Sequence, residues 1–208
     1  MEEEYRTLKA STAAEFTERR SRFLSDAAPV CREEEAVAFL QSVKSRHKEA
    51  RHYVYAYCLR QERITRHSDG GEPQGTAGMP VLDVLLRSGV TDAMIVVTRY
   101  FGGILLGAGG LVRAYSHAAS LALKQSGIAV MKRCALLEIC CGYAQYAAVS
   151  ALIARFGGAV DHTEYRDSVR ICFHLEQKKL NFFCRALSDA TCGKCRAELL
   201  SEKYRSVQ

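Results

Sequence analysis

The chain lacks several features that would mark its class at once. Its 208 residues include no tryptophan and only three prolines. No stretch approaches the ~20 consecutive apolar residues of a membrane helix. Residues 1–5 are acidic and contain no apolar run, so we expect no secretory signal. The sequence also shows no internal repeat, low-complexity tract or long linker, which favours a globular, cytoplasmic protein.

The nine cysteines are an odd number and are scattered along the chain. Without an export signal, we expect reduced thiols in a cytosolic compartment. Cys192 and Cys195 form a Cys-x-x-Cys pair, but a closed zinc site needs a second pair at chelating spacing. The adjacent Cys140 and Cys141 do not supply one. A redox pair should open a helix, whereas this one precedes the last expected strand. We therefore expect no metal and no cofactor.

Positive charge is concentrated in one stretch of the chain. The net charge is +6, and residues 40–67 contain seven lysines and arginines against Glu49 and Glu62, a local charge of +5. Three histidines lie in the same stretch. Such a stretch is typical of a surface that faces an anionic partner. A solvated face that binds nothing has the same composition, and charge alone does not separate the two.

Hydrophobic periodicity predicts alternating strands and helices up to residue 127. The expected strands are residues 5–10, 15–18, 22–27, 52–58 and 93–97. The expected helices are residues 33–46, 79–87 and 111–124. We expect Thr76 to cap the second helix, with Pro80 in its first turn. Two glycine-rich loops, residues 67–75 and 102–110, separate these elements.

After Gly127 the pattern becomes strand, helix, strand, strand, helix, strand, which is typical of a ferredoxin-like domain. The expected strands are residues 134–140, 159–165, 169–175 and 195–200, and the expected helices are residues 143–156 and 176–187. The sequence therefore predicts an α+β protein with two domains, residues 1–132 and residues 136–203.

The strongest local feature joins a buried strand to the start of a helix. Five glycines fall in this connection: Gly102, Gly103, Gly107, Gly109 and Gly110. Glycine lets a ligand approach the main chain, and free amides at a helix start favour anions. Arg99 and Arg113 bracket the loop and can form paired hydrogen bonds to phosphate or carboxylate. Tyr100 follows Arg99, and His117 shares a helix face with Arg113. These residues are the predicted anion or nucleic-acid site.

This glycine-rich connection matches no specific phosphate-binding motif. No Gly-Lys-Ser/Thr follows, so it is not a Walker A loop, and it lacks the final glycine or alanine of the dinucleotide fingerprint. A tight connection whose glycines only permit close packing has the same appearance. Both interpretations stay open from the sequence.

The other glycine-rich loop contains Asp69, Glu72 and Thr76, which we treat as an accessory site. Two carboxylates there can bind a cation or act as acid and base. Local hydrogen bonds from Asp69 and Thr76 to turn backbone are the simpler interpretation, because no nucleophile is paired with a base. We therefore assign no catalytic residue. Three tyrosines at positions 53, 55 and 57 can stack on bases, but their spacing is more typical of core.

Several of these motifs together resemble the Impact family, in particular its bacterial YigZ-type branch. The matching motifs are Ser21-Arg22-Phe23, His52 to Tyr57, Asp69 to Gly78 and Val97 to Ser116. The resemblance implies a ribosomal-protein-S5 domain-2-like N-terminal domain and a ferredoxin-like C-terminal domain similar to a late domain of the translocation elongation factor. Gly70 and Gln74 depart from the Asp and Ser usual in the family, which weakens a cation role for that loop.

The resemblance also implies an association with translation. Eukaryotic relatives restrain the amino-acid-starvation stress pathway by competing for the activator of its kinase. Bacteria lack that kinase, so this partner does not carry over. For the bacterial branch, nucleic-acid or ribosome binding is the usual supposition. Our leading hypothesis is therefore a regulatory protein that binds RNA or the ribosome through a basic, glycine-rich surface. The alternatives are an enzyme that binds a nucleotide or phosphorylated small molecule at residues 102–110, and a protein-interaction module built on the C-terminal domain.

Overall fold

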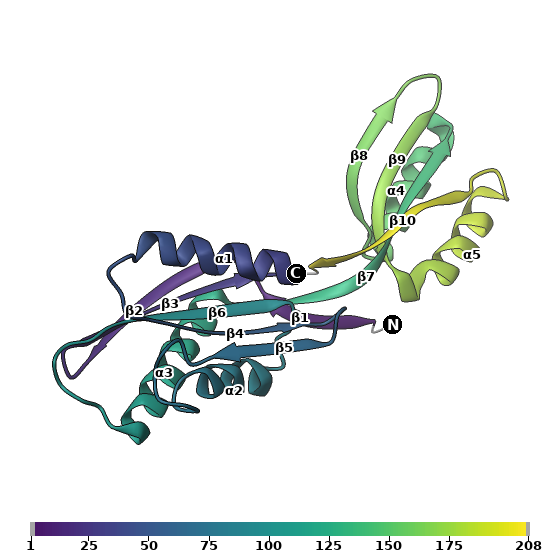
Figure 1. Cartoon of the computed structure of the whole chain (residues 1–208). Coiled ribbons are helices and arrows are strands. Elements are labelled where there is room, and N and C mark those ends of the chain that lie inside the picture. Colours follow the sequence, from purple (N-terminus) through teal and green to yellow (C-terminus); the bar gives the residue numbers. More distant parts are fainter. Residues whose placement is uncertain (1–2, 207–208) are drawn as a thin grey trace. The chain divides into compact units, whose positions relative to one another are not determined.

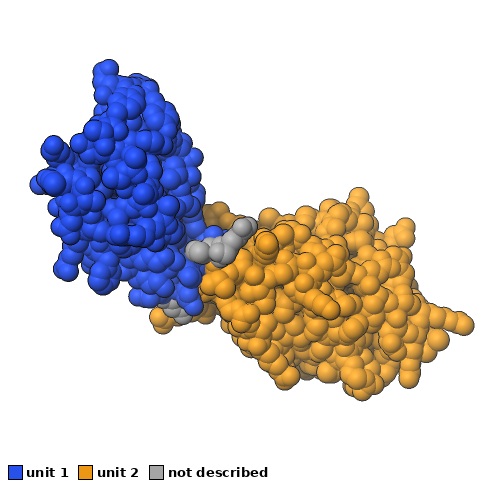
Figure 2. Space-filling model, turned by 180° about the vertical axis from the view of Figure 1, so that it is seen from behind, with its two compact units in different colours: residues 1–4, 131–208 blue, residues 5–130 orange. Residues whose placement is uncertain are grey.

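The structure is a computed structural model that describes residues 3–206, so Met1 and Glu2 of the acidic N-terminus lie outside the described residues. The chain forms two compact units, residues 5–130 and residues 1–4 with 131–208 (Figures 1 and 2). We call them the N-terminal unit and the C-terminal unit. Both combine helices with antiparallel strands, which confirms the α+β class. Among residues 3–206, none of the helices is both long enough and apolar enough to cross a membrane.

The N-terminal unit contains a five-stranded sheet with the order β2-β3-β6-β4-β5. Its strands are β2 (Thr12–Glu18), β3 (Ser21–Pro29), β4 (His52–Leu59), β5 (Ile64–Ser68) and β6 (Ala93–Tyr100). The central strand β6 is buried from Ala93 to Arg99. Its unbroken apolar run predicted this position, because both faces of the strand are covered.

Helices cover both faces of this sheet. They are α1 (Glu33–Arg46), α2 (Gly78–Ser88) and α3 (Ala108–Ser126). Ile95 and Val97 of β6 belong to the core beneath α2 and α3, and Met94 and Val96 belong to the core beneath α1. Tyr57 lies in this second core, and its hydroxyl donates to Glu33 Oε1 at 2.5 Å. The tyrosines of β4 therefore pack against α1, as their spacing favoured.

Two expectations for this unit need correction. Residues 64–68 form the edge strand β5, which the sequence did not reveal because Ile64 is its only large apolar residue. Backbone pairing with β4 holds it in place, and the predicted loop therefore begins only after Ser68. Helix α3 begins at Ala108 instead of residue 111, directly after Gly107 at φ 70°. Gly109 and Gly110 thus lie in its first turn.

The C-terminal unit has the expected ferredoxin-like topology. Its elements are β7 (Ile128–Cys141), α4 (Tyr143–Arg155), β8 (Ala159–Tyr165), β9 (Val169–Glu176), a short 3-10 helix (Gln177–Lys179), α5 (Leu180–Thr191) and β10 (Ala197–Ser206). The strand order β10-β7-β9-β8 is that of a split βαβ domain, and β1 (Glu4–Leu8) also pairs with β7. Leu137, Phe173 and Phe183 belong to the core that α4 and α5 form on one sheet face.

Candidate anion-binding site

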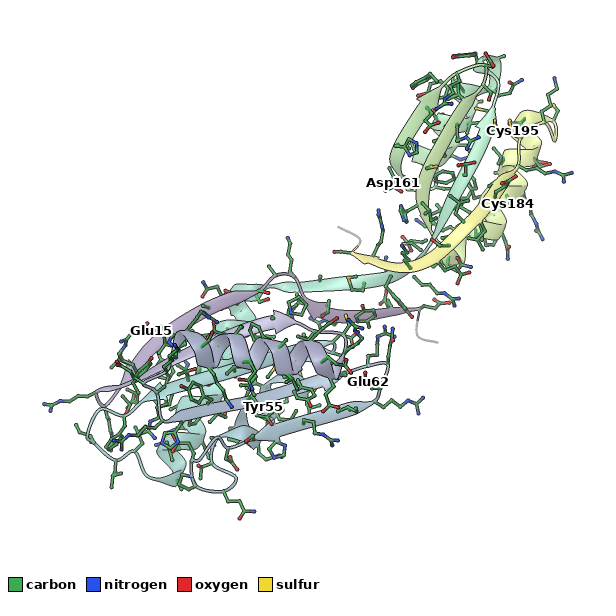
Figure 3. All side chains as sticks on the ribbon, turned by 45° about the horizontal axis from the view of Figure 1, so that its top comes forward. Glu15, Tyr55, Glu62, Asp161, Cys184 and Cys195 are labelled. Atoms are coloured by element: carbon green, nitrogen blue, oxygen red, sulfur yellow. The ribbon has the colours of Figure 1, made fainter. Side chains whose placement is uncertain are left out.

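Four connections meet at one end of the N-terminal sheet, which we call the loop end. They are residues 19–20, 47–51, 69–77 and 101–107. Strand register brings them together, because Arg22 pairs with Tyr100, and His52 pairs with Arg99. In Figure 1 the loop end lies at the left, and Glu62, labelled in Figure 3, marks the opposite end. Both predicted glycine-rich loops therefore lie at the same end.

Arg99 lies inside the unit, which corrects its expected place on the anion-binding surface. The residue is only 4% exposed. Its Nη1 donates to Glu72 Oε1 at 2.7 Å, and its Nη2 donates to Ser21 Oγ at 3.3 Å. The hydroxyl of Tyr115 donates to the same Glu72 oxygen at 2.7 Å. Strand alternation explains the burial, because Arg99 points to the same face as Ile95 and Val97.

This buried network ties the accessory loop to three other elements. Glu72 belongs to the loop, Arg99 to β6, Ser21 to β3 and Tyr115 to α3. Burial, followed by the neighbouring Glu72 carboxylate, raises the pKa of Tyr115, so its hydroxyl stays protonated and acts as a donor. Glu72 is therefore engaged as an acceptor, and the network holds the loop end in one arrangement.

Asp69 caps α2 in place of Thr76, which corrects the expected cap. The Asp69 carboxylate accepts hydrogen bonds from the amides of Gly75, Ala77 and Gly78 at 2.9, 3.1 and 2.8 Å. Thr76 instead donates its hydroxyl to the Pro73 carbonyl at 2.6 Å. Burial disfavours the charged form of Asp69, but the three amides outweigh it and lower its pKa. The hydrogen bonds of Asp69 and Thr76 are therefore bonds to local backbone, which was the simpler interpretation of this loop from the sequence.

Three glycines of the connection at residues 101–107 have structural reasons to be glycine. A Cβ on Gly102 would lie 2.1 Å from the carbonyl carbon and oxygen of Arg20, so only glycine lets the two backbones touch. Gly107 has φ 70°, a conformation that side chains disfavour, although a Cβ there would meet nothing within 4 Å. Gly103 is also in the left-handed region, at φ 82°. Close packing thus accounts for Gly102, while the rest of the loop is open to solvent.

The structure brings Arg113 and His117 together at the surface, as their helical spacing predicted. Both are exposed and line a pocket of about 270 Å³ between the β2–β3 hairpin and α3. The His117 ring packs edge-on against Phe16, with ring centroids 4.8 Å apart. Tyr100 lies elsewhere at the loop end, where its hydroxyl meets His47 Nδ1 at 3.2 Å.

Sequence reasoning missed Arg19 and Arg20, which form the two-residue turn between β2 and β3. Their φ values are 44° and 64°, and Glu18 pairs with Ser21 across the turn. Such turns favour Asn-Gly, because both residues need positive φ, and each non-glycine residue there costs about 1–2 kcal/mol. The sequence contains no turn signature at this point. Strained residues of this kind cluster at functional sites.

Five exposed cations gather at the loop end, and we call them the loop-end cations: Arg19, Arg20, Lys48, Arg51 and Arg113. Within residues 3–206 none of them forms an ion pair. Other cations of the same unit do, such as Arg46 with Asp26 at 2.7 Å and Arg60 with Asp92 at 3.3 Å. The basic stretch at residues 40–67 is therefore divided between paired, structural charges and charges that are free to bind.

The structure offers no metal centre in the part of the chain that it describes. Within residues 3–206, no three histidine, cysteine, aspartate or glutamate side chains are arranged to hold a metal ion. Cys192 is exposed at the end of α5, and Cys195 is buried in the C-terminal core.

The fold and this loop end define a two-domain α+β protein with a group of exposed cations on its first domain. The chain matches the Impact N-terminal domain over residues 19–123 and a domain of unknown function, DUF1949, over residues 139–194. It is 34% identical over 191 residues to the IMPACT family member YvyE of Bacillus subtilis, covering 91% of this chain and 88% of the relative. It is 35% identical over 189 residues to the IMPACT family member YigZ of Escherichia coli, covering 88% of this chain and 92% of the relative. The chain belongs to the Impact family.

A crystal structure of a hypothetical protein shares the whole architecture. It is 32% identical in sequence, with a TM-score of 0.63, and the match covers 98% of this chain and 100% of that one. The order of elements in this chain is therefore shared with that protein.

Proposed function

We propose that the protein binds RNA of the translation machinery through the loop end of its N-terminal unit. The observation that carries this proposal is the gathering of five exposed cations that form no ion pair within the described residues. Only Glu18 and Glu49 place exposed carboxylates in these connections or directly beside them. Unpaired cations on one surface are what a phosphate backbone requires, since its neutralisation releases counterions.

The strained hairpin turn supports the same assignment. Arginines at φ 44° and 64° destabilise the fold relative to Asn-Gly, and they place two guanidinium groups at the tip of the hairpin. Gly102 contacts the Arg20 backbone and fixes this tip beside the second loop. Membership of the Impact family supports a role in the regulation of translation. A cytoplasmic location follows from that role.

Ribosome co-sedimentation at low and moderate salt tests the proposal. We expect the wild-type protein to pellet with ribosomes at low salt and to dissociate as salt rises. The triple variant Arg19→Gln/Arg51→Gln/Arg113→Gln should stay in the supernatant. A matched variant, Arg63→Gln/Arg66→Gln, removes two exposed charges from the same basic stretch but away from the loop end, and it should pellet normally. Equal loss in both variants would reject the loop end as the binding surface.

A protein partner is a second candidate, because apolar side chains protrude from the same loop. Leu105 is 80% exposed, Phe101 46% and Ile104 40%, and exposed apolar groups beside arginines are typical of protein contacts. Replacing Ile104 and Leu105 by serine separates the candidates. If binding to ribosomes does not depend on salt and is lost in this variant, a ribosomal protein is favoured over RNA as the partner.

A further inference from the structure

We propose that the pocket between the β2–β3 hairpin and α3 holds one phosphorylated nucleotide whose base is unpaired. This inference rests on the proposed function and names the part of an RNA that the loop end recognises. The pocket has a volume of about 270 Å³, just below the ~300–1,000 Å³ of typical small-molecule sites. Its size suits a single nucleotide.

The cationic part of the pocket lining, which we call the rim, can hold phosphate. Arg19 reaches it from the hairpin turn and Arg113 from the second turn of α3. Neither guanidinium has an ion-pair partner within residues 3–206, and Glu18 is the one carboxylate among the lining residues. Two positive groups at one pocket repel each other, and a bound phosphate removes that repulsion. Guanidinium groups also match the oxygen geometry of phosphate.

The apolar part of the pocket lining, which we call the floor, is something that an inorganic anion would not require. Phe16, Leu106 and Ala114 line it together with the His117 ring, which packs edge-on against Phe16. Apolar side chains and rings stabilise the flat face of a base. A base can enter such a pocket only when it is not paired within a duplex. The cationic rim and the apolar floor together therefore select an unpaired nucleotide.

The binding experiment uses fluorescence anisotropy of a short single-stranded RNA and of the same RNA in a duplex. We expect the full-length protein to bind the single strand about ten-fold more tightly. Arg19→Gln should weaken single-strand binding about ten-fold, whereas Arg20→Gln, its neighbour outside the pocket, should weaken it only about two-fold. Leu106→Ala on the floor should reduce affinity, and the adjacent Leu105→Ala should not.

Competition separates an RNA nucleotide from a free one as the source of the ligand. Nucleoside monophosphates that displace the RNA at concentrations where inorganic phosphate and nucleosides do not would support the pocket. If monophosphates bind there but RNA does not, the pocket inference stands and the proposed RNA function fails. If duplex and single strand bind equally, and Arg19→Gln equals Arg20→Gln, the pocket inference is overturned. In that case RNA binding through general surface charge survives.

Discussion

The loop end of the N-terminal unit and the open sheet face of the C-terminal unit are both rich in charge, but they manage it differently. On the C-terminal face, Arg170 lies 3.5 Å from Glu138, and Arg205 lies 3.0 Å from Asp161, which is labelled in Figure 3. His174 also contacts Asp161. At the loop end, Arg22 pairs with Glu15 at 2.9 Å, but the five loop-end cations form no ion pair within residues 3–206. Under the proposed function, pairing, and not the number of charges, separates a structural surface from a binding surface.

The largest expected effect concerns the one buried ion pair of the loop end. Glu72→Ala leaves Arg99 buried without its ion-pair partner and should lower the free energy of unfolding by about 3–5 kcal/mol. Glu138→Ala removes the acid of a pair whose arginine is 54% exposed, so it should cost less than about 1 kcal/mol. Urea unfolding of both variants checks the contrast. Similar losses of unfolding free energy in the two variants would show that burial does not distinguish the ion pairs of the two regions.

A methyl group at the contact between hairpin and loop should have the next largest effect. Gly102→Ala forces the Arg20 backbone away and should destabilise the fold by about 1–3 kcal/mol. Gly109→Ala is the control, because a Cβ there meets nothing closer than an arginine nitrogen at 3.6 Å. In a helical turn that change should be neutral or stabilising by up to about 1 kcal/mol. Thermal unfolding of both variants tests whether glycine is required at residue 102 and not at residue 109.

Relief of the strained turn should separate stability from binding. Arg19→Asn/Arg20→Gly supplies the residues that positive φ favours and should stabilise the protein by about 1–2 kcal/mol. The same change removes two loop-end cations and should weaken RNA binding. Chemical unfolding and RNA affinity are measured on one preparation. A variant that is more stable and binds equally well would remove the functional reason for the strain.

Asp69 links the loop end to pH, with a smaller effect. Asp69→Ala removes the acceptor of three amides and should cost about 0.5–2 kcal/mol at neutral pH. Because the folded state lowers the pKa of Asp69, its contribution is complete above the unfolded pKa of about 3.9. This contribution to stability is lost as the pH falls through the pKa of Asp69 in the folded state. Unfolding curves of wild type and variant should therefore converge in acid; a gap that persists there would contradict the capping role.

The sequence predicted most of the architecture because the apolar pattern is strong. The buried run at residues 93–97, the helical stripe at residues 33–46 and the ferredoxin-like order of elements were all confirmed. The strand Ile64–Ser68 was missed because its position at the sheet edge requires backbone pairing and little apolar surface. Patterns that depend on burial are visible in a sequence, whereas those that depend only on backbone pairing are not.

The candidate site was predicted only in part. The spacing of Arg113 and His117 correctly placed them on one surface. Arg99 was misplaced because the expected strand ended at residue 97, whereas β6 continues to Tyr100, and alternation with Ile95 and Val97 turns Arg99 inward. Arg19 and Arg20 were missed because their turn has no local sequence signature. The turn is held by tertiary packing of the Arg20 backbone against Gly102.

The salt dependence of RNA affinity tests the central claim most directly. Each phosphate contact that a lost arginine made should lower the slope of log affinity against log salt by about one. The account predicts that Arg19→Gln/Arg51→Gln/Arg113→Gln reduces the slope by about three, while Arg170→Gln/Arg205→Gln on the paired C-terminal face leaves it unchanged. A slope that falls equally in both variants, or in neither, would contradict the assignment of RNA binding to the unpaired cations of the loop end.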